Sequence, residues 1–191
     1  MKPGRTTRRA KGPAIQPDLN IEADVWEALP ELDALVARAL VAGLAEAPFQ
    51  PMPGAELNIL LTDDVRIRAI NREWRGFDKP TNVLSFPAAN LDRIAKSPVL
   101  GDLVLAYETI AREAQADGKT FPDHLSHLLI HGLLHVLGED HETEAQAQAM
   151  EAREIAALAR LGIGDPYSGL ELEAPEGDTS ADQQQERPSA A

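Results

Sequence analysis

The five histidines of this chain all fall between positions 124 and 141. On a helix, His131 and His135 project from the same face one turn apart. Gly138 can adopt the left-handed conformation that ends a helix and turns the chain back, so that His141 can approach the pair from the side. Three neutral imidazoles hold zinc at about 2.0–2.1 Å and leave a fourth position open for water. The spacing therefore predicts a metal site, and an all-imidazole set suits one zinc ion well.

The same offsets occur in the metalloprotease pattern H-E-x-x-H-x-x-G-x-x-H, with one exception. The position after the first histidine is Gly132, whereas the proteases have a glutamate there as the general base. A hydrolase of peptides or small esters would therefore lack its usual proton acceptor, although this alternative stays open. So does the simpler one, in which the histidines belong to the core or the surface and bind no metal.

The roles of His124, His127 and Glu139 are less defined by the sequence. On a continued helix the two histidines fall near the face that carries the predicted ligands. They could replace a ligand, but we expect them to support the site or to lie at the surface, because three ligands are already present. Glu139 could act as a base, but we expect it to point outward.

Residues 66–79 hold five basic side chains in a chain that is otherwise acidic. We expect Arg75 to lie just past a helix end, in a loop that leads into a strand. The guanidinium group offers a forked donor suited to phosphate. An ion pair with Asp78 or Glu73 would explain this arginine equally well.

The elements that must position these groups follow from the hydrophobic pattern. Short apolar runs predict strands at 19–26, 57–61, 82–86 and 100–105. Helical spacing predicts helices at 32–44, 107–116, 122–137 and 144–161. A further helix is predicted to begin at the cap residues 62–64 and to include residues 65–74. Strands that alternate with helices predict an α/β or α+β layer fold, in which the helix of the metal site ends at Gly138.

The chain has 191 residues, with 31 acidic against 18 basic side chains, a net charge of −13 and no cysteine. This length predicts one domain. The absence of cysteine excludes disulfides, a thiolate nucleophile and a cysteine-built zinc finger, and fits a cytosolic setting. The sequence contains no run of 18 apolar residues, so it predicts no membrane-spanning helix. The basic first residues have no apolar segment after them, so they do not predict a signal peptide.

The charge is distributed unevenly along the chain. Residues 1–13 carry five basic and no acidic side chains, and residues 168–191 carry six acidic side chains and one arginine. Both ends are rich in Pro, Gly, Ser, Gln and charge, which predicts disordered tails around a single domain at 14–167. That domain is acidic, which argues against broad nucleic-acid binding but leaves room for a local site.

Three stretches carry a resemblance to a known family: NREWRGFDKPTNVLSFP at 71–87, GDLV at 101–104 and HLLIHGLLHVLGEDH at 127–141. With LGIGDPY at 161–167, they resemble the YbeY-type rRNA maturation factors, which are zinc-dependent endoribonucleases of bacteria. The resemblance spans about residues 18–167. It departs from the family at Glu139, where relatives often have tyrosine.

The resemblance implies zinc bound by His131, His135 and His141, and a functionally required Arg75. It also implies a compact α/β fold with a small mixed sheet and the metal helix beside it. The implied role is cleavage of single-stranded RNA in the cytoplasm, in 16S rRNA 3′-end maturation and ribosome quality control. The expected partners are the ribosome or its small subunit, with a ribosomal protein or a GTPase as a further candidate, and neither DNA nor a membrane. The alternative is a zinc-stabilised ribosome assembly factor without catalysis.

Overall fold

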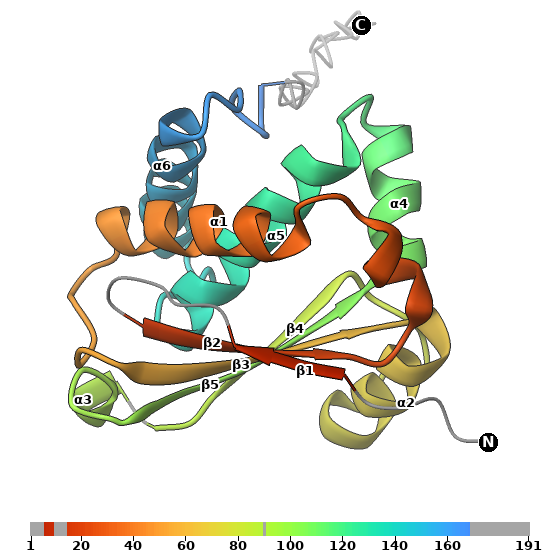
Figure 1. Cartoon of the computed structure of the whole chain (residues 1–191). Coiled ribbons are helices and arrows are strands. Elements are labelled where there is room, and N and C mark those ends of the chain that lie inside the picture. Colours follow the sequence, from red (N-terminus) through yellow and green to blue (C-terminus); the bar gives the residue numbers. More distant parts are fainter. Residues whose placement is uncertain (1–5, 10–14, 90, 169–191) are drawn as a thin grey trace, which may run out of the picture.

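The structure is a computed structural model that describes residues 6–9, 15–89 and 91–168. Its described part contains a mixed sheet of five strands in the order β1-β2-β3-β5-β4 (Figure 1). The strands are β1 (Thr6–Arg9), β2 (Ile15–Ile21), β3 (Ala55–Thr62), β4 (Val83–Pro87) and β5 (Val99–Ala106). The central strands β2, β3 and β5 are parallel, and the edge strands β1 and β4 run antiparallel to their neighbours.

Helices cover both faces of this sheet (Figure 1). They are α1 (Leu32–Glu46), α2 (Asp64–Arg75), α3 (Leu91–Ile94), α4 (Tyr107–Ala116), α5 (Phe121–Val136) and α6 (Glu144–Arg160), with a 3₁₀ turn η1 at Asp24–Ala28. The main core lies between the sheet and α1, α4, α5 and α6, whereas α2 packs on the opposite face through Ile67. The predicted α+β fold with a small mixed sheet is confirmed.

Helix α5 is the best buried helix of the fold and carries most of the histidines. Its N-cap, Thr120, accepts a hydrogen bond from the backbone N–H of Asp123 at 3.2 Å, and Pro122 occupies the first turn, where no backbone N–H is required. Leucines such as Leu125, Leu129 and Leu133 are fully buried. Because α5 is enclosed by other elements, any polar side chain on it needs a partner.

The pairing of β4 with β5 brings the edge strand alongside α5. Pro87 lies opposite Gly101, whose φ of 148° is a conformation that other residues rarely adopt. A Cβ at position 101 would lie 2.2 Å from the carbonyl oxygen of Phe86. Only glycine allows this close approach of β4 to β5, which places Ser85 at the contact with α5.

The start of the chain differs from the prediction in two places. Strand β2 begins at Ile15 and ends at Ile21, so Trp26 lies in η1 rather than in a strand. Its indole N–H donates to the carbonyl oxygen of Thr62 at 2.9 Å, a partner that the fully buried ring obtains only by leaving the sheet. Residues 6–9 of the arm predicted to be disordered form β1. The rest of that arm and residues 169–191 of the acidic tail lie outside the described residues, and the single domain at 14–167 stays a prediction.

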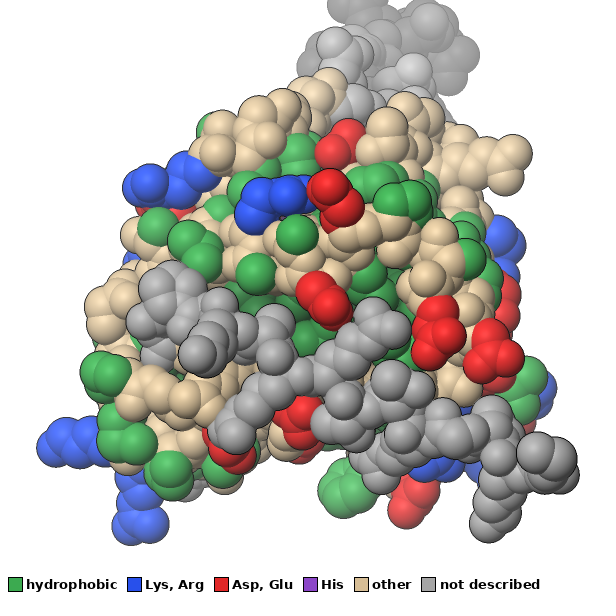
Figure 2. All heavy atoms as spheres, viewed as in Figure 1, with side chains coloured by type: hydrophobic (Ala, Val, Ile, Leu, Met, Phe, Trp, Pro, Cys, Tyr) green, Lys and Arg blue, Asp and Glu red, His purple; other side chains and the backbone are tan. Residues whose placement is uncertain are grey.

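Helix α3 was not predicted, since a four-residue helix is too short to show hydrophobic periodicity. Within the described ranges, no helix has the length and apolar composition needed to cross a membrane. On the face shown in Figure 2, acidic and basic side chains are scattered among hydrophobic and polar ones rather than gathered into a basic patch.

Candidate metal centre

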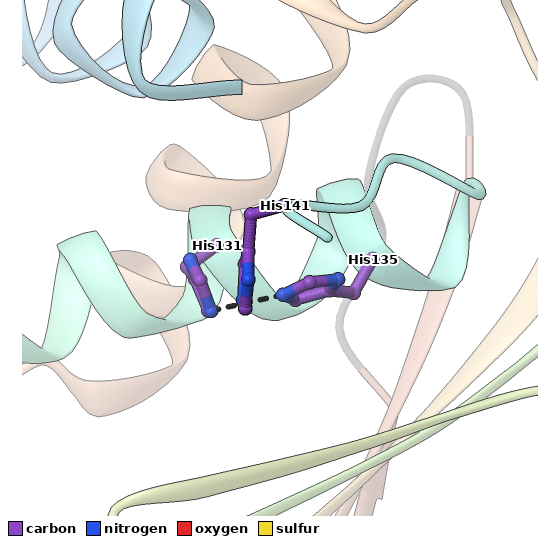
Figure 3. Close-up of side chains that lie close together, drawn as sticks. All are labelled: His131, His135 and His141. Atoms are coloured by element: carbon purple, nitrogen blue, oxygen red, sulfur yellow. Dashed lines mark hydrogen bonds between the residues drawn. The ribbon is translucent and has the colours of Figure 1, made fainter. Parts of the chain in front are cut away.

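The structure brings together the three histidines that the spacing singles out. One ring nitrogen of each of His131, His135 and His141 lies within 4.8 Å of the others (Figure 3). Two of the side chains come from α5, and His141 comes from the loop that follows it. The Nε2 atoms of His131 and His135 are 3.1 Å apart. Two zinc ligands at about 2.0–2.1 Å with tetrahedral angles would be about 3.3 Å apart, so this spacing fits the ion.

The turn after α5 places the third histidine. Gly138 adopts a left-handed φ of 90°, and the N–H of Glu139 returns to the carbonyl oxygen of Leu134 at 3.0 Å. Beyond it, the Asp140 side chain accepts a hydrogen bond from the backbone N–H of His141 at 2.8 Å. The local sequence is therefore sufficient to fold the chain back over the helix.

The hydrogen bonds of the rings decide which nitrogens are free for a metal. The Nδ1 atom of His131 lies 2.7 Å from a carboxylate oxygen of Glu154, and Nδ1 of His135 lies 3.0 Å from the carbonyl oxygen of Glu139. Carboxylates and carbonyl groups only accept, so each Nδ1 carries the proton. In the neutral rings the two Nε2 lone pairs then face each other, an arrangement that a cation between them stabilises.

The environment of His135 keeps its ring neutral. Burial, and then the positive charge that His131 carries when protonated, lower the pKa of His135 from 6.5 to about 4. A neutral imidazole is the form that binds a metal ion. At neutral pH this ring is therefore ready to act as a ligand.

Glu154 on α6 contacts one of the predicted ligands, and the sequence pattern did not single it out. One oxygen of its carboxylate faces His131, and the other lies 2.8 Å from Nε2 of His127 and accepts a hydrogen bond from the Tyr167 hydroxyl. Burial raises the pKa of Glu154, but hydrogen bonds from the two histidines and Tyr167 outweigh it and lower the value to about 2. A signal was present, because this glutamate lies on the apolar face of α6 with Met150.

Arg75 lines the same pocket as two of the predicted ligands, His135 and His141. The pocket has a volume of about 610 Å³, and its lining includes Ser85, Pro87, Glu139, His135, His141 and Arg75. The helix α2 continues through Arg75, which corrects the prediction that this residue lies past the helix end. Gly76 ends the helix instead, with a left-handed φ of 77°. Asp78 is bound by Arg68 at 2.8 and 3.0 Å, not by Arg75.

The remaining polar candidates occupy different positions. His124 is buried and lies 2.9 Å from Glu113, away from the three ligands, whereas His127 is linked to His131 through Glu154. His127 therefore contacts the site through Glu154, whereas His124 pairs with Glu113 outside it. We expected Glu139 to point outward, and the structure shows that it does not. Its side chain is 17% exposed and lies 3.5 Å from Nε of Arg153, an ion pair that draws it into the structure.

Packing excludes a protease-like glutamate at position 132. A Cβ there would lie 2.9 Å from a methyl carbon of Leu103 and 3.2 Å from the hydroxyl oxygen of Ser85. Leu103 is fully buried and cannot move aside without disturbing the sheet. Gly132 therefore allows α5 to lie close to β4 and β5, and the general base of metalloproteases has no space at this position.

Comparisons with known proteins agree on one family. A family model described as "Endoribonuclease YbeY" matches residues 20–162. Proteins named endoribonuclease YbeY are similar to this chain: that of Methylocella silvestris is 49% identical over 78% of this chain and 84% of its own. The protein of Rhodopseudomonas palustris is 52% identical over 78% of this chain and 79% of its own. The protein of Azorhizobium caulinodans is 50% identical over 79% of this chain and 95% of its own. The matched region contains the three histidines and Arg75.

Proposed function

The chain belongs to the YbeY family of endoribonucleases, and from this membership we infer that it cleaves phosphodiester bonds within RNA, with the pocket of His135, His141 and Arg75 as its active site. The observation that carries the assignment of the site is the convergence of three imidazole nitrogens beside a pocket that an arginine also lines. We propose one zinc ion as the cofactor and single-stranded RNA as the substrate.

The three histidines and the arginine of the pocket divide the chemistry between them. His131, His135 and His141 would hold zinc, which when bound polarises a phosphoryl oxygen or lowers the pKa of a water molecule. Arg75 would donate from its fork to the non-bridging phosphate oxygens. It would thereby neutralise the charge that develops on the phosphate in the transition state.

The absence of a base at Gly132 favours the RNA 2′-hydroxyl as the nucleophile. Its oxygen would form a bond to phosphorus and lose its proton to solvent water, while the bond from phosphorus to the 5′-oxygen breaks and the 5′-oxygen takes up a proton from solvent to leave as a hydroxyl group. Glu139 is paired with Arg153 and is a poor candidate for the base. Analysis of product ends tests this step: we expect a 2′,3′-cyclic phosphate, whereas a 5′-phosphate with a free 3′-hydroxyl would contradict it.

The biological role that we propose is maturation of the 16S rRNA 3′ end and ribosome quality control, in the cytoplasm. Its support is the resemblance of residues 71–87 and 127–141 to the family that performs this role. The ribosome or its small subunit would supply the substrate, and a ribosomal protein or a GTPase could direct the chain to it. DNA and membranes are not expected partners.

Metal content and RNA cleavage, measured side by side on the wild type and on His131→Ala, test the proposed function. We expect stoichiometric zinc and cleavage in the wild type, and loss of both in the variant with the fold largely retained. Purified wild type without metal would overturn the site. Cleavage that does not follow the protein through purification, or that persists in the variant, would favour the non-catalytic assembly factor.

A further inference from the structure

The carboxylate of Glu154 is buried in the apolar interface between α5 and α6. The residue is 1% exposed, and its helical neighbours Met150, Ala157 and Leu158 belong to the core. A charged group in such a place is costly unless donors surround it. Its presence therefore calls for an explanation in terms of what it binds.

We propose that Glu154 is a positioning residue for the metal centre, which fixes the tautomer and the orientation of His131 so that Nε2 faces the ion. The proposal rests on the function proposed above. The contact that carries it is the 2.7 Å distance between Nδ1 of His131 and one carboxylate oxygen of Glu154. Since the carboxylate can only accept, the proton is held on Nδ1 and the lone pair on Nε2.

The other oxygen of Glu154 is occupied as well, which prevents the carboxylate from rotating away. Nε2 of His127 lies 2.8 Å from it, and the Tyr167 hydroxyl donates to it. The buried Nδ1 of His127 has no hydrogen-bond partner among the described residues. This agrees with a neutral ring that carries its single proton on Nε2 and directs it to Glu154.

These contacts make the metal ligand depend on elements outside its own helix. His127 and His131 lie on α5, Glu154 on α6, and Tyr167 in the segment that follows α6. The orientation of His131 is therefore set by the docking of α6 and of the segment after it. Carboxylates that hold a metal-binding histidine in this way typically contribute about 10–100-fold to metal affinity.

The variant Glu154→Gln tests the proposal with little change in volume. Its amide nitrogen would have to face either His131 or the donors His127 and Tyr167. We expect zinc affinity, measured by competition with a chromophoric chelator, to fall by about 10–100-fold. The cobalt-substituted variant should also show a changed visible absorption spectrum, because the ligand geometry is altered.

Glu113→Gln is a matched control. Glu113 holds His124 of the same helix α5 at 2.9 Å and also accepts from Asn82, but His124 is not one of the three ligands. This variant should lower the free energy of unfolding and leave zinc affinity and the cobalt spectrum unchanged. A loss of zinc affinity equal in both variants would reduce Glu154 to a structural role and overturn the proposal.

A measurement on the wild type needs no variant. Long-range ¹H–¹⁵N correlation spectra of the zinc-bound protein report which nitrogen of each histidine is protonated. We expect the Nδ1-protonated form for His131, and a proton on Nε2 of His131 would overturn the proposal. Should Glu154→Gln fail to fold, Tyr167→Phe removes one donor from the carboxylate at the edge of the interface, and it should weaken zinc binding by a smaller factor.

The outcomes separate this proposal from the proposed function. Wild-type protein that binds no zinc overturns both. Wild-type protein that binds zinc and cleaves RNA, together with Glu154→Gln and Tyr167→Phe variants of unchanged zinc affinity, overturns the positioning role alone.

Discussion

The protonation of individual side chains determines what the centre can bind. The backbone carbonyl of Glu139 and the carboxylate of Glu154 each accept a hydrogen bond from Nδ1–H of a candidate ligand histidine, and the Nε2 lone pairs of both rings are left available. Arg75 is the complementary group, a permanent cation at the pocket wall. At the scale of residues, the centre therefore combines three candidate metal ligands with a hydrogen-bond donor whose geometry suits phosphate.

Replacement of Arg75 by glutamate should abolish cleavage without loss of zinc. The variant loses a donor to the transition state, an effect of about 100-fold or more, and adds a charge that repels phosphate. Rates of cleavage of a labelled single-stranded RNA, together with metal content, check this. Arg72→Glu is the control, since it lies in the same last turn of α2 but does not line the pocket; equal rates in both variants would remove Arg75 from the mechanism.

His135 should make the stability of the metal-free protein depend on pH. An unfolded histidine binds its proton near pH 6.5, whereas folded His135 does so only near pH 4. Between these values the unfolded chain binds more protons, so the free energy of unfolding falls as the pH is lowered from 6.5 towards 4. Urea denaturation of chelator-treated protein at about pH 7.5 and about pH 5 measures the fall.

The variant His135→Gln provides the comparison, because it removes the titrating group from the same site. The fall in unfolding free energy between the two pH values should be smaller in the variant. An equal fall would mean that other groups cause it. Glu154 contributes at lower pH, since its stabilising effect is lost only as the pH falls from 4.5 towards 2.

At the scale of elements, the position of α5 determines the site. The helix lies against the sheet, and Gly132 is the point of close approach to Leu103 and Ser85. Its C-terminal turn then directs His141 back towards the helix. Because His131 and His135 are carried by a buried helix, their spacing cannot change without repacking of the core.

Gly132→Ala should destabilise the protein, although alanine favours helices. The added methyl group would meet Leu103 and Ser85, and such overpacking costs about 1–3 kcal/mol. Zinc affinity should fall as well, because relief of the contact shifts α5. Chemical denaturation and chelator competition check both effects. Gly164→Ala, at a position with no atom within 4 Å of the added Cβ, should be close to neutral; equal stability of both variants would contradict the packing argument.

At the scale of the whole molecule, the charge limits how RNA is bound. The chain has a net charge of −13, and the pocket itself includes Glu139 and Asp140 beside Arg75. Broad binding to the RNA backbone relies on many neutralised phosphates. A mostly acidic body instead favours a local contact at the pocket.

Free single-stranded RNA should therefore bind weakly. We expect a Kd of about 1 µM or weaker at physiological salt, and weaker still as salt is raised. Fluorescence anisotropy with a 2′-O-methyl oligonucleotide, which offers no 2′-hydroxyl for cleavage, measures this affinity. Sedimentation with purified small ribosomal subunits is the companion experiment and should show tighter binding. Submicromolar binding to RNA of arbitrary sequence would contradict the argument.

Much of the fold follows from local patterns. The helix predicted at 107–116 coincides with α4, and the predicted strands at 57–61 and 100–105 lie inside β3 and β5. The patterns fail where the conformation of a segment depends on a contact with a residue far away in the chain. Trp26 looks like part of a strand, but the indole N–H takes its partner from Thr62, 36 residues away.

The sequence by itself determined the three candidate ligands. The spacing of His131, His135 and His141 around Gly138 is a local property, which a helix and one turn convert into geometry. Only the tertiary structure decided that Glu154 holds His131, that Arg75 shares the pocket, and that position 132 has no room for a base. Each of these contacts joins separate elements, and their distances depend on how helices pack on a sheet rather than on spacing along the chain.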